Sequence, residues 1–171
     1  MRERYNIPND WKMLLSLGRL TWVKGVKNLI QAMPIVLRDY PQTKLVILGK
    51  GEEERDIAET AARLGIKDNI VCRFDFVSEE ERILHYAAAD LCGFPSVYEH
   101  FGIVSLEAMA MVNPVVGAHG VVGFRKQVVP SGPEQNGIHV NGEDHLEFVD
   151  SCLGRCVTCK CAARSVRCER T

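Results

Sequence analysis

The chain of 171 residues contains no apolar run approaching the ~20 residues that a transmembrane helix requires. Its net charge is only −1, so no global electrostatic field attracts nucleic acid or anionic lipid. The N-terminal segment MRERYNIPNDWK lacks the apolar core of a signal peptide. These absences argue against a membrane-spanning protein and a nucleic-acid binder, and they predict a cytoplasmic protein.

The seven cysteines follow no standard zinc-binding spacing, and their placement argues against an oxidising compartment. Cys72 and Cys92 fall within predicted strands, where a free cysteine acts as a small apolar residue. The other five crowd the C-terminal end, from Cys152 to Cys168. We expect residues 150–171 to be a cysteine-rich tail that is disordered or non-native, and we expect no metal site.

Short apolar segments alternate with segments of helical periodicity, and Ser78 with Glu81 forms a capping box at one helix start. We expect buried strands at 12–18, 44–48, 69–74, 89–94 and 114–118. We expect helices at 26–39, 52–64, 78–88 and 103–111. This alternation predicts an α/β fold, a Rossmann-like parallel sheet flanked by helices that spans residues 1–149.

In such sheets, ligands bind beyond the carboxyl ends of the strands. The distinctive segments of this sequence all fall at that edge. They are Gly18-Arg19, Gly49-Lys50-Gly51, Phe76-Val77, residues 96–102 and the loop after Ala118. The sequence therefore places its candidate site on one rim of the sheet.

Glu99 and Glu107 lie eight residues apart, one in a loop and one inside the following helix. The backbone N–H groups of Phe101, Gly102 and Ile103 would be the unpaired donors of that helix N-terminus, at the positive end of its dipole. Glu107 lies among apolar residues, which predicts a largely buried helix and a carboxylate that needs hydrogen-bond donors. This arrangement suits a hydroxyl-rich anion such as a sugar nucleotide.

Arg19 and Lys24 follow the first strand, where they are suited to stabilise the growing charge of a diphosphate leaving group. Taken without the Glu99–Glu107 motif, the two would be read as solvated loop cations. The turn Gly49-Lys50-Gly51 is a weak phosphate-binding signal, because three acidic residues follow it in place of a third glycine.

Several motifs resemble those of the retaining nucleotide-sugar glycosyltransferases of family 4, which have the GT-B fold. Glu99 to Glu107 resembles the E-x7-E motif, and residues 18–25 resemble the G-R-L-x3-K-G element. Residues 49–51 resemble the G-x-G turn, and residues 89–96 resemble the A-D-x4-P-S strand. These elements belong to the C-terminal, donor-binding domain of the family, and they occur here in family order.

The resemblance implies retaining transfer of a hexosyl group from a UDP-sugar or GDP-sugar to an unknown acceptor, with no cofactor. It also implies that the chain is incomplete without an N-terminal acceptor domain or partner chain. Peripheral membrane association would come only through that missing domain. The catalytic residues implied are Glu99, Arg19 and Lys24, with Glu99 near the transferred sugar. The donor-binding residues implied are Gly18, Gly49, Gly51, Val77, Phe101, Gly102, Ile103 and Glu107, with Glu107 on the ribose.

Three positions depart from the family pattern. Val122 stands where the family has a glycine at positive φ, which would strain a valine. Lys126 stands where the family has a glutamate, and Asp75 replaces a glycine. These departures keep an alternative open, in which the chain is a non-catalytic nucleotide-sugar-binding module or degenerate remnant that acts with a partner chain.

Overall fold

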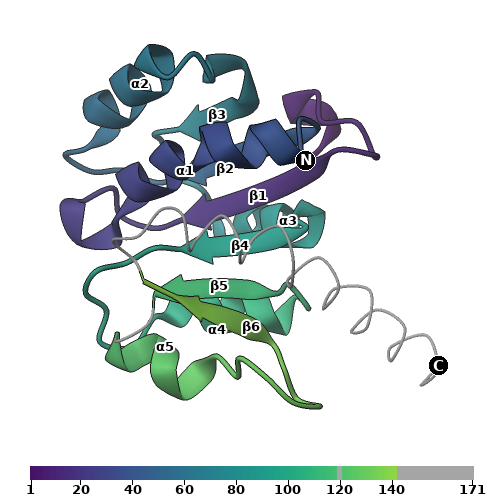
Figure 1. Ribbon diagram of the computed structural model, residues 1–171, viewed down its shortest axis with the longest axis vertical. Coiled ribbons are helices and arrows are strands. Elements are labelled where there is room, and N and C mark those ends of the chain that lie inside the picture. The colour runs from purple at the N-terminus through teal and green to yellow at the C-terminus, as the bar shows by residue number, and fades with distance from the viewer. Residues whose placement is uncertain (119–120, 142–171) are drawn as a thin grey trace.

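Six parallel strands form one sheet in the order β3-β2-β1-β4-β5-β6 (Figure 1). The computed structural model of the protein describes residues 1–118 and 121–141. The strands are β1 (Lys12–Leu17), β2 (Thr43–Leu48), β3 (Ile70–Arg73), β4 (Leu91–Phe94), β5 (Val115–Ala118) and β6 (Gly137–Val140). The parallel α/β sheet predicted from the sequence is therefore confirmed.

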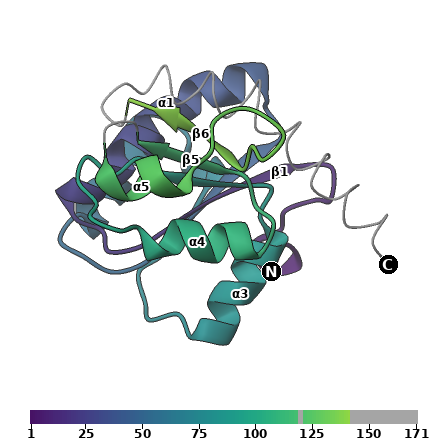
Figure 2. The same ribbon diagram turned by 90° about the horizontal axis from the view of Figure 1, so that it is seen from below.

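Helices cover both faces of the sheet, and Figure 2 shows α3 and α4 on the face opposite to α1. The α-helices are α1 (Val26–Asp39), α2 (Glu54–Arg63), α3 (Glu79–Ala88), α4 (Ile103–Ala110) and α5 (Val122–Gln127). The 3-10 helices are η1 (Glu3–Tyr5), η2 (Trp22–Lys24) and η3 (Lys67–Asn69). Among the residues described, no helix has both the length and the apolar character that crossing a membrane requires.

The central strand β1 contributes side chains to two separate hydrophobic cores. Leu14 packs into the core on the α1 and α2 face, whereas Met13 and Leu15 pack into the core on the α3 and α4 face. All three are buried, because helices cover the sheet on both sides. Burial on both faces explains why the strands are continuous apolar runs rather than alternating ones.

The order in which successive strands are added to the sheet reverses between the neighbouring strands β1 and β4. From β1 the chain adds β2 and then β3 on one side, and it then returns to place β4, β5 and β6 on the other. Neighbouring strands β1 and β4 consequently send their following loops to opposite sides. A crevice opens at such a reversal, at the carboxyl ends of the two strands.

The capping box predicted at the start of α3 is half formed. The backbone N–H of Glu81 donates to Ser78 Oγ at 3.2 Å, as expected. The Glu81 carboxylate instead pairs with the guanidinium groups of Arg73 and Arg4. A charge-assisted contact with two arginines is stronger than a bond to one neutral backbone amide, so the side chain turns toward them.

The prediction that α4 is largely buried is wrong. Ile103 is 62% exposed, Leu106 is also exposed, and only Ser105 and Ala108 of this helix are buried. One side of α4 packs against the sheet while its apolar outer side stays open. The sequence pattern alone could not show this, because residues on both sides are apolar.

A valine occupies a left-handed backbone conformation, but at position 112 and not at position 122. Val122 opens α5, whereas Val112 follows α4 with a φ of 59°. The strain expected at Val122 is therefore absent, and it occurs where the chain leaves α4. A β-branched residue is disfavoured at positive φ, because its side chain clashes with the backbone.

Val112→Gly is expected to raise the free energy of unfolding by about 1 kcal/mol, because glycine adopts positive φ without a steric penalty. Urea denaturation of the two proteins measures this. The matched control is Val122→Gly, which places glycine in a helix and should lower stability by a few tenths of a kcal/mol. A loss of stability in Val112→Gly would show that packing of the valine outweighs its strain.

Candidate functional site

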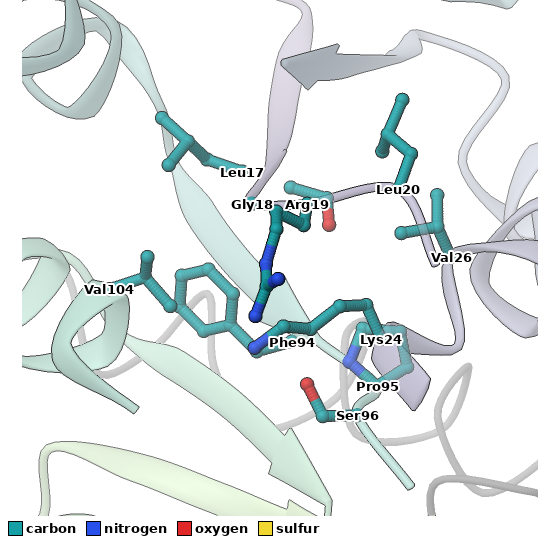
Figure 3. A pocket seen from close by; sticks show the side chains of 11 residues that line it. Leu17, Gly18, Arg19, Leu20, Lys24, Val26, Phe94, Pro95, Ser96 and Val104 are labelled. Atoms are coloured by element: carbon teal, nitrogen blue, oxygen red, sulfur yellow. The ribbon is translucent and has the colours of Figure 1, made fainter. Parts of the chain in front are cut away.

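A pocket lies at the carboxyl ends of β1 and β4, where the chain reverses across the sheet. Helix η2 borders it, because the Val97 N–H donates to the Val23 carbonyl at 2.9 Å and ties the loop after β4 to η2. Figure 3 shows the side chains of Arg19 and Lys24 extending into this pocket. The residues that line it are Ser16, Leu17, Gly18, Arg19, Leu20, Lys24, Val26, Phe94, Pro95, Ser96 and Val104.

Lys24 forms an ion pair with Glu99 beside this pocket. The Lys24 ammonium donates to Glu99 Oε2, and the two side chains are 23% and 16% exposed. Burial alone would raise the pKa of Glu99, but the Lys24 ammonium and the N–H groups of Phe101 and Gly102 outweigh burial and lower that pKa. Glu99 is therefore a carboxylate at neutral pH.

The helix N-terminus at α4 differs from the sequence expectation. The N–H groups of Phe101 and Gly102 are directed at the Glu99 carboxylate closely enough to lower its pKa, so this carboxylate already occupies part of the helix N-terminus. The carboxylate reaches them because the loop from Glu99 to Gly102 is short and turns back on itself. Its charge also favours the positive end of the helix dipole.

Arg19 is the unpaired cation of the pocket. Its side chain is exposed, and it forms no hydrogen bond or ion pair with any residue in 1–118 or 121–141. Lys24, in contrast, already has its charge balanced by Glu99. Among the described residues, the pocket therefore presents one positive charge without a partner beside one neutralised pair.

Glycines at the ends of β1 and β2 let two loops pack against each other. A Cβ on Gly49 would lie 1.8 Å from the Gly18 carbonyl oxygen, and one on Gly51 would lie 2.1 Å from the Leu20 carbonyl oxygen. The Gly51 N–H also donates to a Glu54 carboxylate oxygen at 2.9 Å. These contacts give both glycines a packing role, and their contact with a donor stays a prediction.

Helix α5 holds the loop that carries Glu99, a connection that the sequence analysis missed. The Gly123 N–H donates to the Glu99 carbonyl at 3.2 Å, and the Gln127 side-chain amide donates to the Phe101 carbonyl. The Phe124 ring packs so closely on Gly102 that a Cβ there would lie 2.8 Å from the ring. These partners are more than twenty residues apart in sequence, so no local pattern indicates them.

Glu107 does not line the pocket that contains Arg19 and Lys24. It lies on the side of α4 that faces α3, at a cavity of about 230 Å³ between the two helices. Tyr86 donates to Glu107 Oε2 at 3.0 Å, and Arg82 Nη1 lies 3.4 Å from Oε1. A carboxylate among apolar residues needs hydrogen-bond donors, and Tyr86 and Arg82 of α3 supply two of them.

The remaining predicted residues surround the same rim. Val77 is partly buried in the loop before α3, next to the highly exposed Phe76. Phe101 and Ile103 are both exposed at the start of α4. No group of three or more potential metal ligands occurs within the described residues.

Comparison with known proteins identifies the family to which the chain belongs. The family model described as glycosyl transferases group 1 matches residues 1–152. An uncharacterized glycosyltransferase of Methanocaldococcus jannaschii is 40% identical over 139 residues, which cover 81% of this chain and 34% of that protein. The chain spans about a third of the length of the curated relatives it matches.

Solved structures agree with the fold. Sucrose-phosphate synthase of Thermosynechococcus elongatus superposes with a TM-score of 0.78 at 28% identity, over 96% of this chain and 42% of that one. HepE of Anabaena, in complex with UDP and glucose, superposes with a TM-score of 0.75 at 21% identity, over 99% of this chain and 46% of that one. The six-stranded sheet with its flanking helices matches the C-terminal Rossmann-like domain of GT-B glycosyltransferases.

Proposed function

The chain belongs to the group 1 glycosyl transferases, and we propose that it is the donor-binding half of a retaining family 4 enzyme. Such an enzyme transfers a hexosyl group from a UDP-sugar or GDP-sugar to an acceptor. The observation that carries the proposal is Arg19, which has no partner among the described residues, beside the Lys24–Glu99 pair at the point where strand order reverses.

Arg19 and Lys24 are proposed to hold the donor diphosphate. A guanidinium without a partner can bind two phosphate oxygens at once, and a nearby ammonium adds a point charge. Both cations would stabilise the charge that grows on the diphosphate as the glycosidic bond breaks. This charge stabilisation requires no metal ion or cofactor.

Glu99 is proposed to contact the transferred sugar. Its carboxylate stays ionised and is fixed by Lys24 and by two backbone N–H groups, so it presents a constant negative charge. A diphosphate bound to Lys24 would lie next to Glu99, and in this proposal the carboxylate is then close to the bond between sugar and phosphate. The HepE structure was solved with both UDP and glucose, which is consistent with a donor of this class.

The acceptor is proposed to be bound by a second domain or partner chain over this rim. The chain covers 34% and 35% of two curated relatives, which leaves enough length in such enzymes for a further domain. Trp22, Phe101, Ile103 and Val122 are each more than half exposed at this rim. A second domain would bury this apolar surface and exclude water from the reaction. We place the assembled enzyme in the cytoplasm, with any membrane contact made through the second domain.

Arg19→Ala and Lys24→Ala are each expected to weaken nucleoside diphosphate binding by about 1.5 to 3 kcal/mol, the typical contribution of a charge-assisted hydrogen bond. The loss should be larger for Arg19, because Lys24 must first give up its contact with Glu99. Calorimetric titration of the 171-residue chain with UDP, and separately with GDP, measures both.

The matched control is Lys67→Ala. Lys67 lies in η3, at the amino end of β3, so its removal should leave binding at the carboxyl ends of the strands unchanged. Circular dichroism would confirm that all variants are folded. Equal affinity in the original protein, Arg19→Ala and Lys24→Ala would rule out the diphosphate role. Failure of the original protein to bind either nucleotide would contradict the proposed function as a whole.

A further inference from the structure

A buried tyrosine hydroxyl from α3 is directed at the carboxylate of Glu107. Tyr86 is only 1% exposed, and its hydroxyl oxygen lies 3.0 Å from Glu107 Oε2 and 3.3 Å from the Val104 carbonyl oxygen. A phenol has one hydrogen to donate. Since a charged acceptor forms the stronger bond and lies closer, Glu107 receives it.

The position of Tyr86 is itself fixed. Its ring packs in the core on the α3 and α4 face, and its carbonyl accepts a buried hydrogen bond of 2.6 Å from Asn113 Nδ2. Burial, and next the Glu107 carboxylate, raise the pKa of Tyr86 well above its usual value. The hydroxyl therefore stays protonated and remains a donor wherever the protein is folded.

Arg82 gives the same carboxylate a second, weaker partner. It lies one helical turn before Tyr86, and its Nη1 is 3.4 Å from Glu107 Oε1. Its side chain is 33% exposed, so solvent screens this ion pair and its contribution is small. Each oxygen of Glu107 thus has one donor from α3 and keeps further lone pairs for a ligand.

Glu107 is partly exposed near the start of α4. Its side chain is 27% exposed, and it lies about 6 Å along α4 from the helix start. Helical side chains tilt toward the N-terminus, which brings the carboxylate toward the rim. Val104, whose carbonyl is the other neighbour of the Tyr86 hydroxyl, lines the pocket that contains Arg19 and Lys24.

We propose that Tyr86, with a smaller contribution from Arg82, is a positioning residue that orients Glu107 to accept hydrogen bonds from the vicinal hydroxyls of a ribose. This inference rests on the proposed function, in which the ligand is a ribonucleoside diphosphate. Two neighbouring hydroxyls require both carboxylate oxygens in a fixed plane. A hydroxyl from a rigid core residue fixes that plane before the ligand arrives, so less ordering is needed on binding.

The experiment compares ribose and deoxyribose ligands. The 171-residue chain and its Tyr86→Phe variant are titrated by calorimetry with UDP and 2′-deoxy-UDP, and with the corresponding GDP pair. The original protein should prefer the ribonucleotide. Tyr86→Phe should reduce the ratio of the two affinities about fivefold, the effect of a moderate coupling between contacting residues.

Two variants separate orientation from general destabilisation. Tyr5→Phe removes another hydroxyl that contacts α3, at His85 Nε2 (2.7 Å), and should leave the ratio unchanged. In a Glu107→Gln protein, adding Tyr86→Phe should produce little further change in the ratio. Arg82→Gln alters a partly exposed residue, should fold normally and should reduce the ratio about twofold.

The outcomes are distinct. If the original protein distinguishes ribose from deoxyribose and the Tyr86→Phe and Arg82→Gln variants do so equally well, the inference is wrong while the proposed function stands. If Tyr86→Phe does not fold, an unchanged ratio in Arg82→Gln overturns it. A protein that binds no nucleotide, or that does not distinguish the sugars, overturns the inference as well.

Discussion

Glu99→Ala is expected to remove the affinity advantage of an intact sugar donor over its nucleoside diphosphate. Glu99 is proposed to contact the sugar, so UDP-glucose should lose about tenfold or more in affinity relative to UDP. Affinity for UDP itself should be retained or increased, because Lys24 and the N–H groups of Phe101 and Gly102 lose a competing partner. Paired titrations with UDP and UDP-glucose, and with GDP and GDP-mannose, measure both quantities.

Glu107→Ala should behave differently from Glu99→Ala. Glu107 is proposed to contact the ribose, which all four ligands share, so its loss should weaken all of them by similar factors. Glu59→Ala serves as the control, since it removes an exposed carboxylate on α2 that is absent from both cavities. If Glu99→Ala abolishes UDP binding while Glu107→Ala leaves it intact, the two roles have been assigned wrongly.

Gly49→Ala is expected to lower the free energy of unfolding by about 3 kcal/mol or more. Gly49 has a φ of 144°, and its added Cβ would lie 1.8 Å from the Gly18 carbonyl oxygen. Backbone cannot rotate away as a flexible side chain can, so the loops after β1 and β2 must separate. Because the loop after β1 carries Arg19, nucleotide affinity should fall together with stability. Urea denaturation and UDP titration measure the two effects.

Gly18→Ala is the matched control for that substitution. Gly18 has a φ of 152°, close to that of Gly49, but no atom lies within 4 Å of an added Cβ. The two variants share the backbone penalty, and their difference isolates the steric clash. Equal losses of stability would show that the loops are not held together as tightly as these contacts indicate.

The local sequence pattern predicted most of the fold. Strand and helix positions followed from apolar runs and helical spacing, and strands β1 to β5 lie within one or two residues of the expected bounds. Helix α5 was missed because it has only six residues, too few for an apolar stripe to show helical periodicity. The strain at Val112 was missed because a left-handed residue after a helix is normally indicated by glycine. The cysteine-rich tail at 150–171 lies outside the described residues.

The sequence by itself determined the class of the sheet, and it predicted the rim that carries the candidate site and the residue types proposed to approach a donor. These depend on periodicity and on short motifs, which are properties of neighbouring residues. Only the tertiary structure decided which of those residues meet. The order of the strands sets β1 beside β4, and this brings Lys24 to Glu99 across 75 positions of sequence. The packing of α3 against α4 gives Glu107 its Tyr86 partner and places it beside the cavity between these two helices, outside the lining of the pocket of Arg19. Such contacts arise from long-range packing. Many residues contribute to the free energy of burying two helices on one sheet, so no single motif predicts which side chains meet.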